Sequence, residues 1–102
     1  MAEIKNLGPV PSYLELHADK VIISLAVPVE LGGVRRDKIV MRTPSLKDIE
    51  LADLQEPDDS KREYDKLVFS SLTEVPEADW GNLSLKDWGR VQAAYFRLIG
   101  ED

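Results

Sequence analysis

The chain has 102 residues, enough for one small domain with a small hydrophobic core. Nineteen Asp and Glu residues against thirteen Lys and Arg give a net charge of −6, which argues against nucleic acid or an anionic membrane as the main partner, because both require a basic surface. The lack of cysteine excludes disulfides, thiol nucleophiles and cysteine-ligated zinc, and because no spanning helix or secretory signal is visible, we expect a small soluble protein of the cytoplasm.

Residues 1–20 show no clear hydrophobic period. We expect them to form an N-terminal arm that is either flexible or supplies an extra strand, because Leu14, Leu16 and Ala18 alternate with polar residues. A single α+β domain is expected over residues 21–100.

Two strands joined by a tight turn are predicted at the start of this domain. The first runs from Val21 to Val27 with alternating faces, and Pro28 either ends it or lies at a sheet edge. Gly32-Gly33 supplies the positive φ angles of a hairpin turn, and the second strand runs from Arg36 to Thr43. A two-stranded hairpin is marginal in water, so it must pack on helices or gain strands from the arm or from another subunit.

The returning strand has one apolar face with Ile39 and Met41, and one basic face. Basic residues there can simply discourage unwanted pairing at the edge of a sheet. We nevertheless expect a homo-oligomer, formed through the hairpin edge or an apolar helix face. The candidate residues for self-association are Arg35, Arg36, Lys38 and Arg42.

Three helices follow in the second half of the chain. They are expected over Leu46 to about Gln55, Lys61 to Glu74 and Leu85 to Ile99. Ser45 and Ser84 are N-cap candidates, each with an aspartate three residues later, and Pro76 opens a short turn that continues to Trp80. The predicted fold is an N-terminal β-hairpin followed by three α-helices.

The polar residues do not form a catalytic or metal-binding motif. His17 is the single histidine and lies in the arm, where we expect it to be solvated. An acidic cluster lacks the spacing and the turn glycine of a calcium loop; it consists of Glu56, Asp58, Asp59 and Glu63. Gly32-Gly33 lacks the spacing of a phosphate-binding loop. We therefore expect no enzymatic activity, no cofactor and no metal.

Five short motifs follow one another between Val21 and Ile99. They are Leu25-Ala26-Val27-Pro28, Leu31-Gly32-Gly33-Val34, Val40-Met41-Arg42-Thr43-Pro44-Ser45 with Lys47-Asp48, Leu72-Thr73-Glu74-Val75-Pro76, and Leu83-Ser84-Leu85-Lys86-Asp87-Trp88. In this order they resemble the tail assembly chaperone family of Mu-like and P2-like phages. The arm has no counterpart in the family pattern.

The resemblance implies a non-enzymatic protein of the infected bacterium's cytoplasm that is not part of the mature virion. Such a protein would bind the tape-measure protein, keep it soluble and help to recruit tail-tube protein around it. A longer form of the chain, made by ribosomal frameshifting, is a further implied partner.

Surplus apolar helix faces are the candidates for binding the tape-measure protein, because a tape measure exposes long apolar helical surface before the tube encloses it. The alternative for each of these side chains is that it completes the small core. The candidates are Leu46, Ile49, Leu51, Leu54, Trp88, Tyr95 and Phe96.

The acidic charge supports an alternative function. Residues 1–44 carry six basic and five acidic side chains, and residues 45–102 carry seven and fourteen, so the second half has a net charge of −7. A small acidic protein-interaction module, such as an inhibitor that mimics nucleic-acid charge, would need a dense carboxylate face. Candidates for that face are Asp58, Asp59, Glu63, Asp65, Glu74, Glu77 and Asp79, interrupted by Lys61, Arg62 and Lys66.

Overall fold

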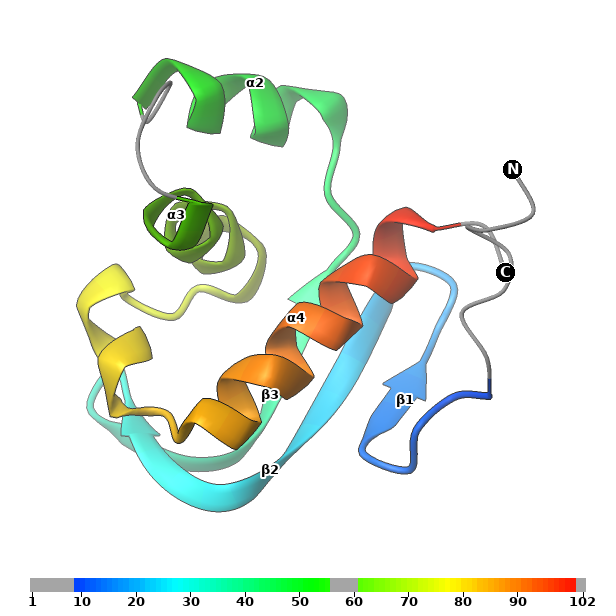
Figure 1. The fold of residues 1–102 in the computed structure, drawn as a ribbon, viewed down its shortest axis with the longest axis vertical. Coiled ribbons are helices and arrows are strands. Elements are labelled where there is room, and N and C mark those ends of the chain that lie inside the picture. The colour runs from blue at the N-terminus through cyan, green and yellow to red at the C-terminus, as the bar shows by residue number, and fades with distance from the viewer. Residues whose placement is uncertain (1–8, 56–60, 101–102) are drawn as a thin grey trace.

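The computed structural model describes residues 9–55 and 61–100, which form a three-stranded sheet and a helical layer. The elements are the strands β1 (Leu14–Leu16), β2 (Lys20–Leu31) and β3 (Val34–Arg42), the α-helices α2 (Leu46–Gln55), α3 (Lys61–Thr73) and α4 (Leu85–Ile99), and the 3₁₀-helix η1 (Glu77–Asn82). Figure 1 shows α4 crossing one face of the sheet, while α2 packs on α3 and stands away from the sheet. The predicted α+β class is confirmed.

Alternation along β2 and β3 gives the sheet one covered face. Val21 lies opposite Met41 and Ile23 opposite Ile39, and each of these four side chains is at most 1% exposed. Lys38 points to the other face and is exposed. The prediction of one apolar and one basic, solvated face is confirmed.

The turn between β2 and β3 forms where two glycines were expected to allow it. Gly32 has φ of +62° and Gly33 of +80°, a pair of positive angles that matches the twist of a two-residue hairpin. The N–H of Gly32 donates to Asp79 Oδ2 at 2.6 Å, which ties the turn to η1.

The expected two-stranded hairpin was incomplete, because β1 adds a third antiparallel strand. Leu14 lies opposite Ile23 in the sheet order β1-β2-β3. The preceding residue is held by α4, since the Arg90 guanidinium lies 4.5 Å from the centre of the Tyr13 ring. The N-terminal segment thus contributes to the covered face of the sheet.

Pro28 does not end the strand, contrary to one expectation. β2 continues to Leu31, and its pairing with β3 shifts register between Ser24 and Val29. Pro28 lies inside this irregular stretch, where its missing N–H costs no ladder hydrogen bond. The bend also leaves backbone donors of β2 available to α4.

The helices begin and end close to the predicted residues. Ser45 and Ser84 cap α2 and α4, because the side-chain oxygen of each accepts the backbone N–H three residues later. α3 ends one residue early, and Glu74 follows it with a positive φ of 66°, typical of a helix C-terminus. The turn after Pro76 is a 3₁₀-helix that extends to Asn82.

Aromatic rings form the centre of the helical layer. The Phe69 ring is 1% exposed and lies 6.3 Å from Trp80, 5.4 Å from Trp88 and 5.2 Å from Tyr95, measured between ring centroids. The tilted and edge-on arrangements are those that aromatic quadrupoles favour. Phe69 therefore joins α3, η1 and α4 into one core.

Candidate functional site

The helix α2 exposes three leucines. Ala52 is buried and Ile49 half-buried, whereas Leu46 is 74%, Leu51 47% and Leu54 79% exposed. The apolar residues spread around this ten-residue helix, so packing on α3 covers only part of them. We call Leu46, Leu51 and Leu54 the leucine surface.

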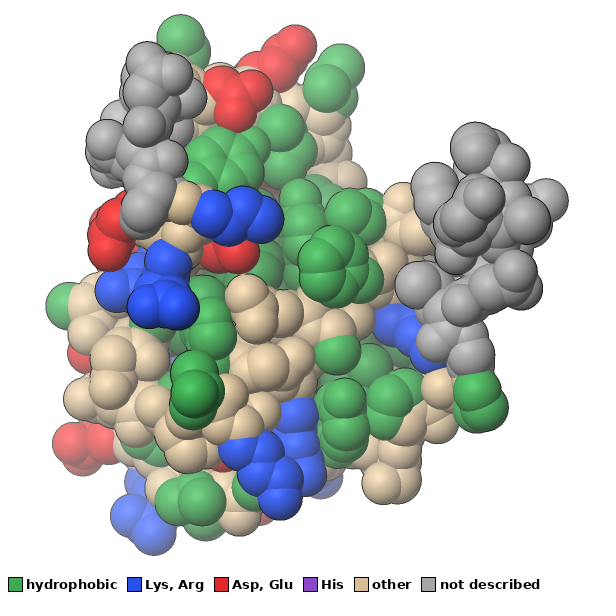
Figure 2. Space-filling view, viewed as in Figure 1, with side chains coloured by type: hydrophobic (Ala, Val, Ile, Leu, Met, Phe, Trp, Pro, Cys, Tyr) green, Lys and Arg blue, Asp and Glu red, His purple; other side chains and the backbone are tan. Residues whose placement is uncertain are grey.

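Helix α4 presents further apolar side chains near its C-terminal end. Phe96 is 54% and Ile99 50% exposed, whereas Trp88 is buried and Tyr95 half-buried. Figure 2 shows hydrophobic side chains over the C-terminal half of α4 and around α2 on the same side of the molecule. A hollow of about 60 Å³ beside Phe96 lies between α3 and α4.

The predicted partner-binding residues thus divide into two groups. Leu46, Leu51, Leu54 and Phe96 are at the surface, while Ile49, Trp88 and Tyr95 pack in or against the core. The first group lies on two helices, with the three leucines on α2 and Phe96 near the C-terminal end of α4. Their role in binding stays a prediction.

The residues predicted for self-association lie on β3. Arg35, Lys38 and Arg42 are exposed and Arg36 is half-buried. Arg42 is engaged within the chain, because its guanidinium donates to both Asp48 carboxylate oxygens at 2.8 and 3.0 Å. Self-association through this strand stays a prediction.

Asp48 links the start of α2 to the sheet. Besides Arg42, it accepts the backbone N–H of Ser45 at 2.8 Å. These hydrogen bonds, from Arg42 above all, hold the pKa of the Asp48 carboxyl well below its ordinary value of 3.8 and raise the pKa of Arg42.

We expect Asp48→Asn to reduce the decrease in the free energy of unfolding that occurs as the pH falls into the acid range. A carboxyl whose folded pKa is lowered contributes stability above its ordinary pKa and loses it as the pH falls below about 4. The loss should be at most about 1 kcal/mol, because Arg42 is half exposed and water screens the pair. Urea midpoints at about pH 5 and pH 3 measure it, with Asp37→Asn as an exposed control. Parallel profiles for wild type and Asp48→Asn would contradict this assignment.

A buried carboxylate joins α4 to β2. Asp87 is fully buried, and its two oxygens accept the backbone N–H groups of Ala26 at 2.7 Å and Val27 at 3.1 Å. Arg90 donates to the Ser24 carbonyl at 2.8 Å beside it. Sequence reasoning identified Asp87 only through its place after an N-cap, since nothing local indicates that it binds a strand 61 residues earlier.

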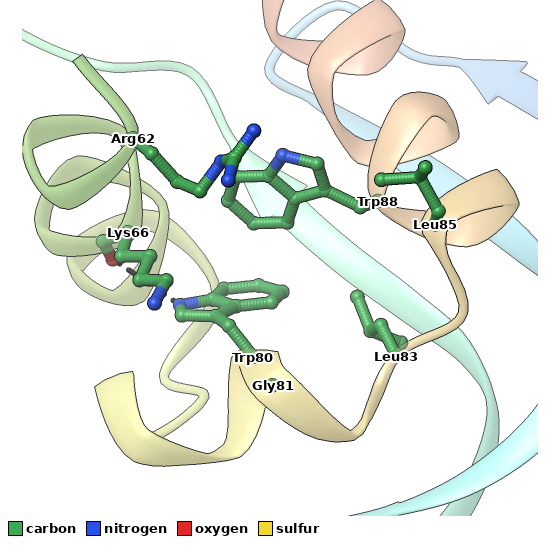
Figure 3. A pocket seen from close by; sticks show the side chains of 7 residues that line it. All are labelled: Arg62, Lys66, Trp80, Gly81, Leu83, Leu85 and Trp88. Atoms are coloured by element: carbon green, nitrogen blue, oxygen red, sulfur yellow. Dashed lines mark hydrogen bonds between the residues drawn. The ribbon is translucent and has the colours of Figure 1, made fainter.

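A pocket of about 230 Å³ opens where α3, η1 and the start of α4 meet (Figure 3). Arg62 and Lys66 come from α3, Trp80 from η1, and Leu85 and Trp88 from α4. Sequence reasoning named Trp88 as a binding candidate with the core as its alternative, and it treated Arg62 and Lys66 as interruptions of an acidic face. Only the arrangement in space places them around one hollow.

Two carboxylates of the proposed acidic face are engaged within the chain. Asp65 is 5% exposed and pairs with Lys61 Nζ at 2.9 Å, and Asp79 accepts the Gly32 N–H. Asp58 and Asp59 lie outside the described residues. Asp65 and Asp79 are therefore not free carboxylates of such a face.

The described parts of the chain hold neither a metal-ligand cluster nor a membrane-spanning helix. Across residues 9–55 and 61–100, no three histidine, aspartate or glutamate side chains are grouped to hold a metal ion. No helix in those ranges is both long and apolar enough to cross a membrane. His17 is exposed and lies 2.7 Å from Glu15 Oε2.

Comparison with protein families decides between the two functional interpretations. The family described as phage tail assembly chaperone proteins, E, or 41 or 14, matches residues 22–100. The chain belongs to this chaperone family. The match to the chaperones runs from β2 through α4 and leaves β1 outside, and it confirms the resemblance drawn from the five motifs. Comparisons with curated proteins and with solved structures give no significant match to this chaperone.

Proposed function

We propose that this chaperone binds the tape-measure protein of its phage and keeps it soluble until tail-tube subunits, which it helps to recruit, enclose it. The observation that carries the proposal is the leucine surface. Three large apolar side chains on one short helix are 47–79% exposed, and clustered exposed apolar side chains are typical of protein-interaction sites.

The position of α2 suits this role. The helix packs on α3 and stands away from the sheet (Figure 1), so its remaining sides are open to a partner. An apolar helix of the tape-measure protein could pack against the leucine surface while Glu50 and Asp53, exposed on the same helix, keep the complex hydrated. The proposed function consists of covering apolar surface and needs no catalysis. It takes place in the host cytoplasm before the virion is complete.

Co-expression with the tape-measure protein tests the proposal. The double variant Leu46→Gln with Leu54→Gln should weaken the complex at least about 100-fold, because each buried leucine contributes about 1.5–3 kcal/mol and 1.4 kcal/mol corresponds to tenfold. Soluble yield and co-purification measure the loss, and both side chains are exposed enough for the fold to persist.

The matched control is Val34→Gln, which removes a 54%-exposed apolar side chain from the hairpin instead of α2. It should leave the complex intact. A tape-measure protein that is equally soluble alone and does not co-purify with the wild-type chain would overturn the proposal. Equal binding by the double variant would overturn the assignment to the leucine surface.

A further inference from the structure

The pocket between α3, η1 and α4 combines aromatic walls with positive charge. Indole rings of Trp80 and Trp88 and the side chains of Leu83 and Leu85 form its apolar part (Figure 3). Both charged side chains that line it, Arg62 and Lys66, are positive, and no carboxylate is among the described lining residues. This is unusual in a chain with a net charge of −6.

Some of the hydrogen-bond donors in the pocket already have an acceptor within the protein. Trp80 Nε1 donates to the Lys66 carbonyl oxygen at 3.2 Å and to Ser70 Oγ at 2.8 Å. Lys66 Nζ lies 3.6 Å from a Glu63 carboxylate oxygen. Trp80 and Lys66 are therefore partly satisfied by the protein itself.

Two other donors lack such partners. Trp88 is 9% exposed, and within the described parts of the chain neither its indole N–H nor the Arg62 guanidinium has a hydrogen-bond or ion-pair partner. Figure 3 shows the Trp88 indole nitrogen on the side of the ring toward which Arg62 extends. A buried indole N–H normally has an acceptor, so this edge of the pocket has an unused donor beside an unused cation.

We propose that this pocket binds an acidic, apolar segment of a partner protein, through a glutamate or aspartate carboxylate and the aliphatic side chain next to it. The carboxylate would accept from the Arg62 guanidinium, whose fork of donors matches its two oxygens, and from the Trp88 indole N–H. The adjacent aliphatic side chain would lie against the indole rings and leucines.

Pocket size and charge favour this occupant. A hollow of about 230 Å³ is smaller than the roughly 300–1,000 Å³ typical of small-molecule and cofactor sites, and it suits one or two side chains. Two cations and the overall acidic charge do not provide the basic surface that a nucleic-acid strand requires. No residue of the leucine surface lines the pocket, so the site is separate from the one in the proposed function.

Intrinsic fluorescence can report on this pocket alone, because the chain has two tryptophans and both line it. The probe is an acetylated, amidated pentapeptide of sequence Leu-Glu-Leu-Leu-Glu, and its control has glutamine in place of both glutamates. The acidic peptide should produce a saturable change in tryptophan emission. The glutamine peptide should bind at least about tenfold more weakly, and added salt should weaken binding of the acidic one.

Variants assign the effect to Arg62. Arg62→Gln should weaken binding of the acidic peptide at least about tenfold. Arg35→Gln makes the same substitution at an exposed position of β3 and should leave the affinity for the peptide unchanged. The Leu46→Gln, Leu54→Gln double variant should bind the peptide normally, which separates this site from the tape-measure surface. The proposal is overturned by equal responses to both peptides, by no response up to millimolar acidic peptide, by an unchanged Arg62→Gln variant, or by a saturable response to an oligothymidylate alone.

Discussion

Asp87→Ala should lower the free energy of unfolding by about 2–4 kcal/mol. The substitution leaves two partly buried backbone N–H groups, those of Ala26 and Val27, without their acceptor. A fully buried unsatisfied donor costs about 1–3 kcal/mol, and partial access to water keeps each of these toward the lower end of that range. The pairing of β2 with β3 is irregular at this point, so no carbonyl of the neighbouring strand replaces Asp87 as the acceptor. Urea unfolding followed by circular dichroism measures it.

Two further variants separate the strand contact from helix capping. Asp87→Asn keeps one carbonyl oxygen as an acceptor but turns an amide donor toward the other N–H, so it should lose less than Asp87→Ala. Ser84→Ala removes only the N-cap of α4, a change of about 1 kcal/mol. If Asp87→Ala costs no more than Ser84→Ala, the link between α4 and β2 has no energetic role.

Phe69→Ala should be similarly damaging, at about 3–5 kcal/mol. The ring is 1% exposed and contacts aromatic rings on η1 and α4 as well as anchoring α3. Its removal leaves a cavity and also breaks the edge-on and tilted ring pairs. The unfolding midpoint and the near-UV circular dichroism of the neighbouring tryptophans should both change.

The second phenylalanine of the chain provides the control. Phe96 is 54% exposed, so Phe96→Ala should change stability by less than about 1 kcal/mol. Equal losses for the two variants would show that Phe69 is not the centre of the helical layer. If Phe96→Ala remains stable but loses partner binding, the binding surface also includes α4.

Local chemistry explains why most elements could be predicted. The Gly32-Gly33 turn and the capping serines Ser45 and Ser84 depend on neighbouring residues only, and the helices and long strands carry their periods in the sequence. β1 could not be predicted firmly, because three residues are too few to establish a period. Its place depends on pairing with Ile23 and on the Arg90–Tyr13 contact.

The candidate site was predicted less completely, because it too depends on contacts between residues that are far apart in the sequence. The spread of leucines around α2 suggested contacts on two sides, and the structure supplies one of them within the chain. No sequence period shows which leucines α3 covers. The pocket of Arg62 and Trp88 was missed because it depends on three elements meeting, and Asp87 was missed as a strand ligand because its partners are 60 and 61 residues away.

That separation has a consequence for the chain as the ribosome makes it. At roughly 5–20 residues per second, about 3–12 seconds pass between synthesis of Ala26 and of Asp87. The strands can pair during this interval, and α3 and η1 can contact them before α4 is made. The cover over the face that carries Ile23 and Met41 is complete only with α4, and closing so long a loop costs entropy before any contact repays it. A chaperone that we propose shields apolar surface on another chain thus passes through a stage of its own synthesis in which its sheet is itself incompletely covered.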